Sequence, residues 1–312
     1  MKLELVDAAT TGTWKVDGSQ LSGECDGVTF TGERSWWGRT WTIVGTSEFP
    51  IPERILLFIS AHGMEHGFWR DMRSGHHSFD IDHFVFCNTP ALLPHIVGRA
   101  TVAAINETPE RDAAVKLYVR NRTMRTTSMV REHDRRGIAR HVAIHRALAT
   151  DHRAFLATWQ DNLAGAAGRG GATWPPKGTI NSRVGTLLVG LTWEMPPESR
   201  DGAEWDQGYR SLRTEVTSHG DRTKPAWTLA LAEGRAPTHV IGSRGLVLQG
   251  KPSVPIDRIA NLLEEAAVVQ LEYGPKLRVS VHQLATARNL TAARQLVELL
   301  LQAKAGSTSP YR

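Results

Sequence analysis

Residues 84–90 read FVFCNTP, an apolar run typical of a buried β-strand followed by residues that start a helix. Thr89 is a suitable helix N-cap, and Pro90 fits the first helical position because proline lacks the N–H that would be unpaired there. The same transition occurs at residues 246–252, LVLQGKP, ahead of a second helical pattern. Two such transitions in one chain predict a repeated unit of mixed strand and helix structure.

Short β-branched and aromatic runs separated by glycine, proline and acidic residues predict the strands. In the first half we expect strands at 13–16, 27–31, 39–44, 54–60, 79–87, 115–119 and 123–130, and in the second half at 185–193, 226–231, 238–241, 246–248 and 276–281. Helical periodicity predicts a helix after Pro90, a long helix from about 134 to 163, and helices at 255–270 and 291–304.

We therefore predict an α+β fold of two similar modules that arose by internal duplication, each an antiparallel sheet with helices packed on one face. Chance similarity between two α+β segments is the alternative. The first module covers residues 1–165 and ends in the long helix, and the second covers 179–305. A linker rich in glycine and proline is expected at 164–178, and a flexible tail at 306–312.

The composition is that of a globular protein, with 41% hydrophobic and 22% charged residues. Cys25 and Cys87 are the only cysteines, which excludes a disulfide framework and any four-cysteine zinc module. The first residues show no apolar stretch behind a basic head, and no apolar run reaches the length of a membrane span. We expect a soluble, cytoplasmic protein.

The sharpest local motif follows the expected fourth strand. Residues 62–66, HGMEH, have the spacing H-x-x-E-H, which resembles the motif of inverzincin peptidases. The resemblance implies a zinc hydrolase in which His62 and His66 bind the metal and Glu65 is the general base. Glu132 would supply a third ligand, as distant glutamates do in the pitrilysin-like peptidases that this short motif also resembles.

Glycine favours a different interpretation of this motif. Ligands at this spacing need a helix, but Gly63 lies within the motif and Gly67 follows it, and each costs about 1 kcal/mol in a helix interior. Five of the 13 histidines lie between residues 62 and 83, in a stretch typical of a loop. Loop histidines without a catalytic role and no cofactor are therefore the main prediction, with zinc as the alternative.

Arginine is concentrated between residues 120 and 140, in a chain whose formal net charge is +5. We name this stretch the basic segment; it contains Arg120, Arg122, Arg125, Arg131, Arg135, Arg136 and Arg140. It is typical of a solvated face or of an interface with an acidic partner, and polyanion or nucleic-acid binding is the alternative. The nucleic-acid hypothesis rests on charge alone, because no zinc finger or other nucleic-acid-binding motif accompanies the segment.

Two further clusters have structural interpretations. His141, His145 and His152 share one side of the expected long helix, where we predict core or interface histidines that donate to backbone carbonyls. Trp36, Trp37 and Trp41 suit a strand core better than a ligand platform.

The patterns together favour a non-catalytic binding or scaffold protein that acts through protein contacts, because no coherent catalytic set accompanies the repeated framework. A zinc hydrolase and a polyanion-binding protein are the alternatives.

Overall fold

The computed structural model describes residues 12–36, 39–51, 55–62, 71–107, 115–131, 134, 136–193, 212–220, 225–232, 236–282 and 284–302. The chain forms two compact units: unit 1 comprises residues 1–155 and 195–210, and unit 2 comprises 156–194 and 211–312. Within the described residues, no helix combines the length and apolar character needed to cross a membrane.

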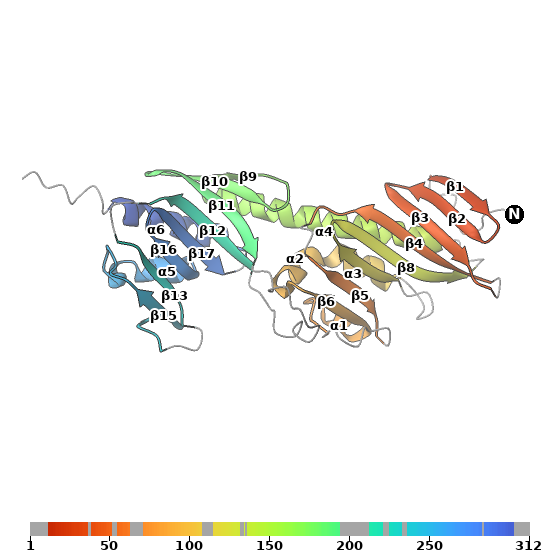
Figure 1. The fold of residues 1–312 in the computed structure, drawn as a ribbon, viewed down its shortest axis with the longest axis horizontal. Coiled ribbons are helices and arrows are strands. Elements are labelled where there is room, and N and C mark those ends of the chain that lie inside the picture. The colour runs from red at the N-terminus through yellow and green to blue at the C-terminus, as the bar shows by residue number, and fades with distance from the viewer. Residues whose placement is uncertain are drawn as a thin grey trace, which may run out of the picture. The chain divides into compact units, whose positions relative to one another are not determined.

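Unit 1 contains an antiparallel sheet in which each strand pairs only with antiparallel neighbours (Figure 1). Its strands, in sheet order, are β1 (Gly12–Asp17), β2 (Gln20–Cys25), β3 (Val28–Arg34), β4 (Thr40–Glu48), β8 (Thr123–Arg131), β7 (Lys116–Arg120), β5 (Leu57–Ala61) and β6 (His83–Cys87). Side chains of β8 alternate between buried and exposed along most of the strand, so one face of the sheet is inside and the other faces solvent.

Helices pack on the inner face of the unit 1 sheet. They are α1 (His77–Asp82), the 3-10 turn η1 (Pro90–Leu92), α2 (Leu93–Ile96), α3 (Arg99–Asn106) and the first part of α4 (Gly137–Gly165). Ile138 and Val142 of α4 pack into a buried cluster with Phe30, Trp41 and Ile43 from the sheet. The apolar stripe predicted for the long helix is thus the surface that covers the strands.

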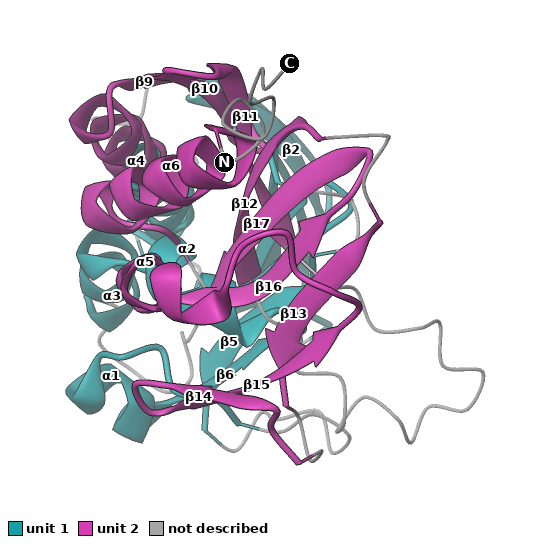
Figure 2. Cartoon of the chain, turned by 90° about the vertical axis from the view of Figure 1, so that its left-hand side faces the viewer, with its two compact units in different colours: residues 1–155, 195–210 teal, residues 156–194, 211–312 magenta. Residues whose placement is uncertain are grey.

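Unit 2 repeats this plan with its own antiparallel sheet. The strands, in sheet order, are β14 (His239–Ile241), β15 (Arg244–Gln249), β13 (Trp227–Leu231), β16 (Val268–Tyr273), β17 (Lys276–His282), β12 (Leu212–His219), β11 (Gly185–Trp193), β10 (Lys177–Ser182) and β9 (Gly168–Gly170). The end of α4, the 3-10 turn η4 (Ile256–Arg258), α5 (Ala260–Glu265) and α6 (Ala287–Gln302) complete the unit. Figure 2 shows α5 and α6 on one side of this sheet.

The two sheets have the same topology. Read from the opposite edge, the second sheet runs β9, β10, β11, β12, β17, β16, β13, β15, which matches β1, β2, β3, β4, β8, β7, β5, β6 in chain order, with β14 added at the edge. The α+β fold with two similar modules is therefore confirmed, and the shared strand order supports internal duplication. By sheet position the counterpart of β7 is β16, although the sequence of β7 looks more like the start of β17.

Four segments differ from the sequence prediction. Residues 79–82 form the end of α1 instead of a strand, because Asp80 turns back to accept hydrogen bonds from the N–H and hydroxyl of Ser74, at 2.9 and 2.6 Å. The helix predicted at 255–270 stops early because Ala267 adopts a left-handed φ of +52°, and β16 follows. Strands β2 and β12 were not predicted.

The expected linker at 164–178 contains strand β9 and the first residues of β10. Its glycines allow close packing: a Cβ on Gly170 or on Gly178 would lie 2.5 Å from the Leu163 side chain. Glycine at these positions lets the strands pack closely against α4. The glycine-rich composition suggested a flexible linker, but in the structure it allows this close packing. The expected tail at 306–312 lies outside the described residues.

A single carboxylate ties α3 to α4. Asp151 of α4 accepts hydrogen bonds from the N–H groups of Gly98, Ala100 and Thr101 at 3.0, 3.3 and 2.8 Å. These groups belong to the first turn of α3, which has no intrahelical partners for them. Gly98 allows the approach, because a Cβ there would lie 2.6 Å from an Asp151 oxygen.

We predict that Asp151→Ala lowers the free energy of unfolding by about 2–3 kcal/mol, because three N–H groups lose their acceptor. Asp151→Asn retains a carbonyl acceptor and is expected to lose less. Urea titration measures the effect, and hydrogen exchange of the α3 amides localises it. A loss for Asp151→Ala no larger than that of an exposed substitution would contradict this role.

Candidate functional site

Most of the residues proposed for the zinc site lie outside the part of the chain that the structure describes. Glu65, His66 and Glu132 lie outside the described residues. His62 is half-buried just after β5, and its backbone N–H donates to the carbonyl of Asp82 at 3.2 Å. Among the described residues, no group of three or more histidine, cysteine, aspartate or glutamate side chains is placed to hold a metal ion. The zinc hypothesis therefore stays a prediction.

His83 is the histidine of this region whose surroundings are best defined. Its ring stacks on Phe79 with centroids 4.3 Å apart, and its Nδ1 lies 3.2 Å from the Phe79 carbonyl, to which it donates. Burial lowers the pKa of His83, and the nearby charge of His62 lowers it further against the opposing effects of the Phe79 carbonyl and Asp82. These contacts hold the ring against α1.

The structure spreads the basic segment along a strand. Arg120 and Arg122 lie at the β7–β8 turn, whereas Arg131 lies at the far end of β8. Thr123 and Arg131, the first and last residues of β8, are eight residue steps apart, about 26 Å at roughly 3.3 Å per residue. Arg125 is exposed on the strand between them, and Arg135 lies outside the described residues. The segment does not form one compact patch.

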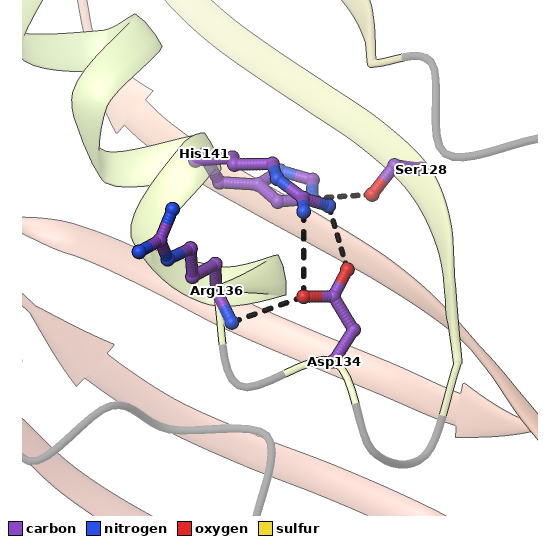
Figure 3. Close-up of polar contacts among 5 residues, drawn as sticks. Ser128, Asp134, Arg136 and His141 are labelled. Carbon is purple, nitrogen blue, oxygen red and sulfur yellow. Dashed lines mark hydrogen bonds and ion pairs between the residues drawn. The ribbon is translucent and has the colours of Figure 1, made fainter. Parts of the chain in front are cut away.

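Asp134 organises the arginines beside the start of α4 (Figure 3). Its carboxylate accepts from the Arg140 guanidinium at 2.6 and 3.4 Å and from the backbone N–H of Arg136 at 3.0 Å. Arg140 is thereby paired within the chain, while the Arg136 side chain remains exposed. Arg136, rather than Arg140, is the member of this pair that is exposed to solvent.

A buried hydrogen-bonded chain joins α4 to the sheet. His141 lies 2.7 Å from the hydroxyls of both Ser128 and Thr126, and His145 lies 2.9 Å from Thr126 and 2.7 Å from Ser47. Two neutral rings satisfy all of these contacts: Ser128 donates to His141, which donates to Thr126, which donates to His145, which donates to Ser47. The reverse direction works equally well. Figure 3 shows the contact between His141 and Ser128.

These histidines are core residues, as their helical position predicted. Hydroxyl groups are partners of His141 and His145, and the backbone carbonyl of Gly45 also hydrogen-bonds to His145. His141, His145 and His152 are 0%, 3% and 3% exposed. Burial lowers the pKa of His141 to about 3, with smaller contributions from His145 and Arg140, and burial lowers that of His145 to about 4. The hydroxyls could have been noticed in the sequence, since Thr126 and Ser128 lie between Met124 and Val130 on the buried face of β8.

The tryptophan cluster separates into a buried and an exposed member. Trp41 of β4 is 2% exposed in the core, whereas Trp36 in the β3–β4 turn is 95% exposed. Trp37 lies outside the described residues. The turn is closed at its base by the Ser35 N–H, which donates to the Thr40 carbonyl at 2.8 Å, and by the Thr40 hydroxyl, which donates to that of Ser35 at 2.7 Å.

Several arginines lie at the same end of the unit 1 sheet as Trp36. Arg34 ends β3, exposed Arg39 lies in the turn, and exposed Arg131 pairs with Thr40 across β4 and β8. Arg136 follows β8 before α4. We call this surface the Trp36 end; its members are Arg34, Trp36, Arg39, Arg131 and Arg136. It combines part of the basic segment with an exposed indole.

A polar pocket of about 550 Å³ lies in unit 2 between the β10–β11 turn and α6. Its lining residues are Asn181, Ser182, Arg183, Arg294, Gln295 and Glu298. Glu298 accepts from the backbone N–H of Arg183 at 2.9 Å, and Arg294 donates to the Ala166 carbonyl at 3.4 Å. The Glu298 carboxylate and the Nη1 of Arg294 are thus engaged with the chain itself.

We predict that acid destabilises unit 1 through His141 and His145. Their pKa values are lower when folded than the ordinary value of 6.5, so the unfolded chain binds more protons below that pH. Stability is full above about pH 7 and falls toward pH 4 by about 1.4 kcal/mol per pH unit for each histidine. Urea titrations from pH 7.5 to pH 4 measure the slope, and His145→Gln should make it shallower. An unchanged slope in that variant would contradict the assignment.

Comparison with known proteins adds little to this geometry. No protein-family model and no curated protein matches the chain. One solved structure is similar, that of the mycobacterial trehalose monomycolate transport factor A, at 10% identity and a TM-score of 0.29. The match covers 48% of this chain and 75% of that one. A likeness at this TM-score supports no conclusion about fold or function.

Proposed function

We propose that the chain is a non-catalytic binding protein that acts as a scaffold through protein–protein contacts, and that a partner docks at the Trp36 end. The observation that carries the proposal is the 95% exposed indole of Trp36, held at the tip of a closed hairpin. Burying a tryptophan removes about 150–250 Å² of surface from water, worth on the order of 4 kcal/mol. An indole presented in this way is a typical anchor of a protein interface.

The arginines around Trp36 define the chemistry of the partner. Exposed Arg39, Arg131 and Arg136 place positive charge at the same end of the sheet as the indole. Tryptophan and arginine are the residue types enriched where interface energy is concentrated, and rim charges steer the approach of an oppositely charged surface. The matching partner has an apolar pocket for the indole within an acidic rim.

The same arginines give polyanion binding as the second candidate function. A polyanion would engage the guanidinium groups mainly through its phosphates, so its affinity would fall steeply with salt. A protein partner anchored by the indole would show a weaker salt dependence and a strong dependence on Trp36. These two responses separate the hypotheses.

We predict that Trp36→Ala weakens the complex with the physiological partner at least about tenfold, because the anchor is lost while the exposed site leaves folding unchanged. Full-length chain and variant are used to capture proteins from an extract of the source cells. Each protein that depends on Trp36 is then purified, and its affinity is measured by calorimetry at two salt concentrations.

Leu188→Ala is the matched control, since Leu188 is 61% exposed on β11 in unit 2 and tests nonspecific apolar adhesion. It is expected to bind like the original chain. The proposal fails if every purified partner binds equally well to the original chain and to Trp36→Ala. Recovery of nucleic acid with a steep salt dependence would favour the polyanion function instead.

A further inference from the structure

The two sheets have four edge strands, and these differ in how well they are protected from pairing with another strand. In unit 2 both edge strands, β9 and β14, have only three residues. In unit 1 the β6 edge is covered by a neighbouring segment: Met72 N–H donates to the Val85 carbonyl at 2.7 Å, and Val85 N–H donates to Asp71 at 3.0 Å. Short strands and covered edges are the ordinary means by which proteins prevent unwanted strand pairing.

Strand β1 is the exception. It has six residues at the edge of its sheet, and among the described residues it pairs only with β2 (Figure 1). A two-residue turn, whose first residue Gly18 has a φ of +58°, closes the hairpin at the pair Asp17–Gln20. Since hydrogen bonding alternates along an antiparallel pair, Thr13, Lys15 and Asp17 bond to β2. The N–H and C=O groups of Gly12, Trp14 and Val16 therefore point away from the sheet.

We propose that β1 pairs antiparallel with β1 of a second copy of the chain, so that the two unit 1 sheets become continuous across a twofold axis at Trp14. This register opposes Gly12 to Val16 of the other copy and Trp14 to Trp14. It uses all three outward-facing residues and forms about six backbone hydrogen bonds. It also brings together two half-buried indoles that each pack on Phe30 at 5.4 Å within their own copy.

Charge selects this register over its neighbours. A twofold axis at Lys15 would set two lysines directly opposite each other on the outer face, where like charges are destabilising. An axis at Val16 would oppose Trp14 to Gly18, which lies in the turn and not in extended strand. With the axis at Trp14, Lys15 lies opposite Thr13 of the other copy and no like charges meet. Of these three alignments, the one centred on Trp14 avoids both the lysine pair and the turn.

The test is the oligomeric state of the full chain, measured by sedimentation equilibrium over a range of concentrations. We expect a reversible monomer–dimer equilibrium. Val16→Pro removes an outward N–H that β2 does not use, so it should abolish the dimer while circular dichroism stays unchanged. A chain that is monomeric at every concentration, or a Val16→Pro dimer as stable as the original, would overturn the proposal.

Substitutions at Thr13 test the register without touching any backbone donor. Thr13→Glu would face Lys15 of the other copy twice in the dimer, which should strengthen dimerisation roughly threefold to tenfold. Thr13→Lys, the matched control of opposite sign, should weaken it by a similar factor. Equal effects of the two substitutions would overturn the Trp14-centred pairing. This proposal does not depend on the Trp36 end, since Trp36→Ala is expected to leave dimerisation unchanged.

Discussion

The pairing of polar groups under α4 constrains unit 1 more than any other feature. The helix covers a sheet face that contains the hydroxyls of Ser47, Thr126 and Ser128, and an unpaired buried polar group costs about 1–3 kcal/mol. Two histidines one helical turn apart meet all three hydroxyls at 2.7–2.9 Å. Sliding the helix by one turn would break each contact. These hydrogen bonds therefore fix the position of α4 along the sheet more precisely than apolar packing alone would. The Asp151 contacts with α3 depend on that position.

The long helix and the repetition of a mixed strand and helix unit were accessible from the sequence because each rests on many residues, whereas the order of the strands in each sheet was not. The boundaries of individual helices and strands could not be predicted in this way. Strand β2, QLSGEC, has few apolar residues and is a strand because both of its neighbours pair with it. The end of α5 depends on Ala267 in a left-handed conformation that glycine usually adopts, so no residue type marked it. The glycines near 170 indicated flexibility in the sequence but serve tight packing against Leu163.

The candidate site was harder to predict because it depends on which residues the fold brings together. The basic segment is continuous in sequence, yet an extended strand separates its two ends. Among its described members, we place Arg131 and Arg136 at the Trp36 end. The other arginines of the Trp36 end, Arg34 and Arg39, come from a hairpin about ninety residues earlier in the chain and were not part of the predicted segment. Trp36 and Trp41 differ by five positions, and only the turn between β3 and β4 explains why one is in solvent and the other in the core.

The two proposed surfaces of unit 1 have a joint consequence for a scaffold. Strands β1 and β3 run in the same direction because each is antiparallel to β2, so Trp36 lies toward the end of the sheet at which β1 finishes. In an antiparallel pair of β1 strands the two copies run in opposite directions, which places their Trp36 ends at opposite ends of the joined sheet. Such a dimer is too widely spaced to clamp one small partner, but it can bridge two partners or two distant sites on one. Simultaneous engagement would then raise the apparent affinity without any new contact.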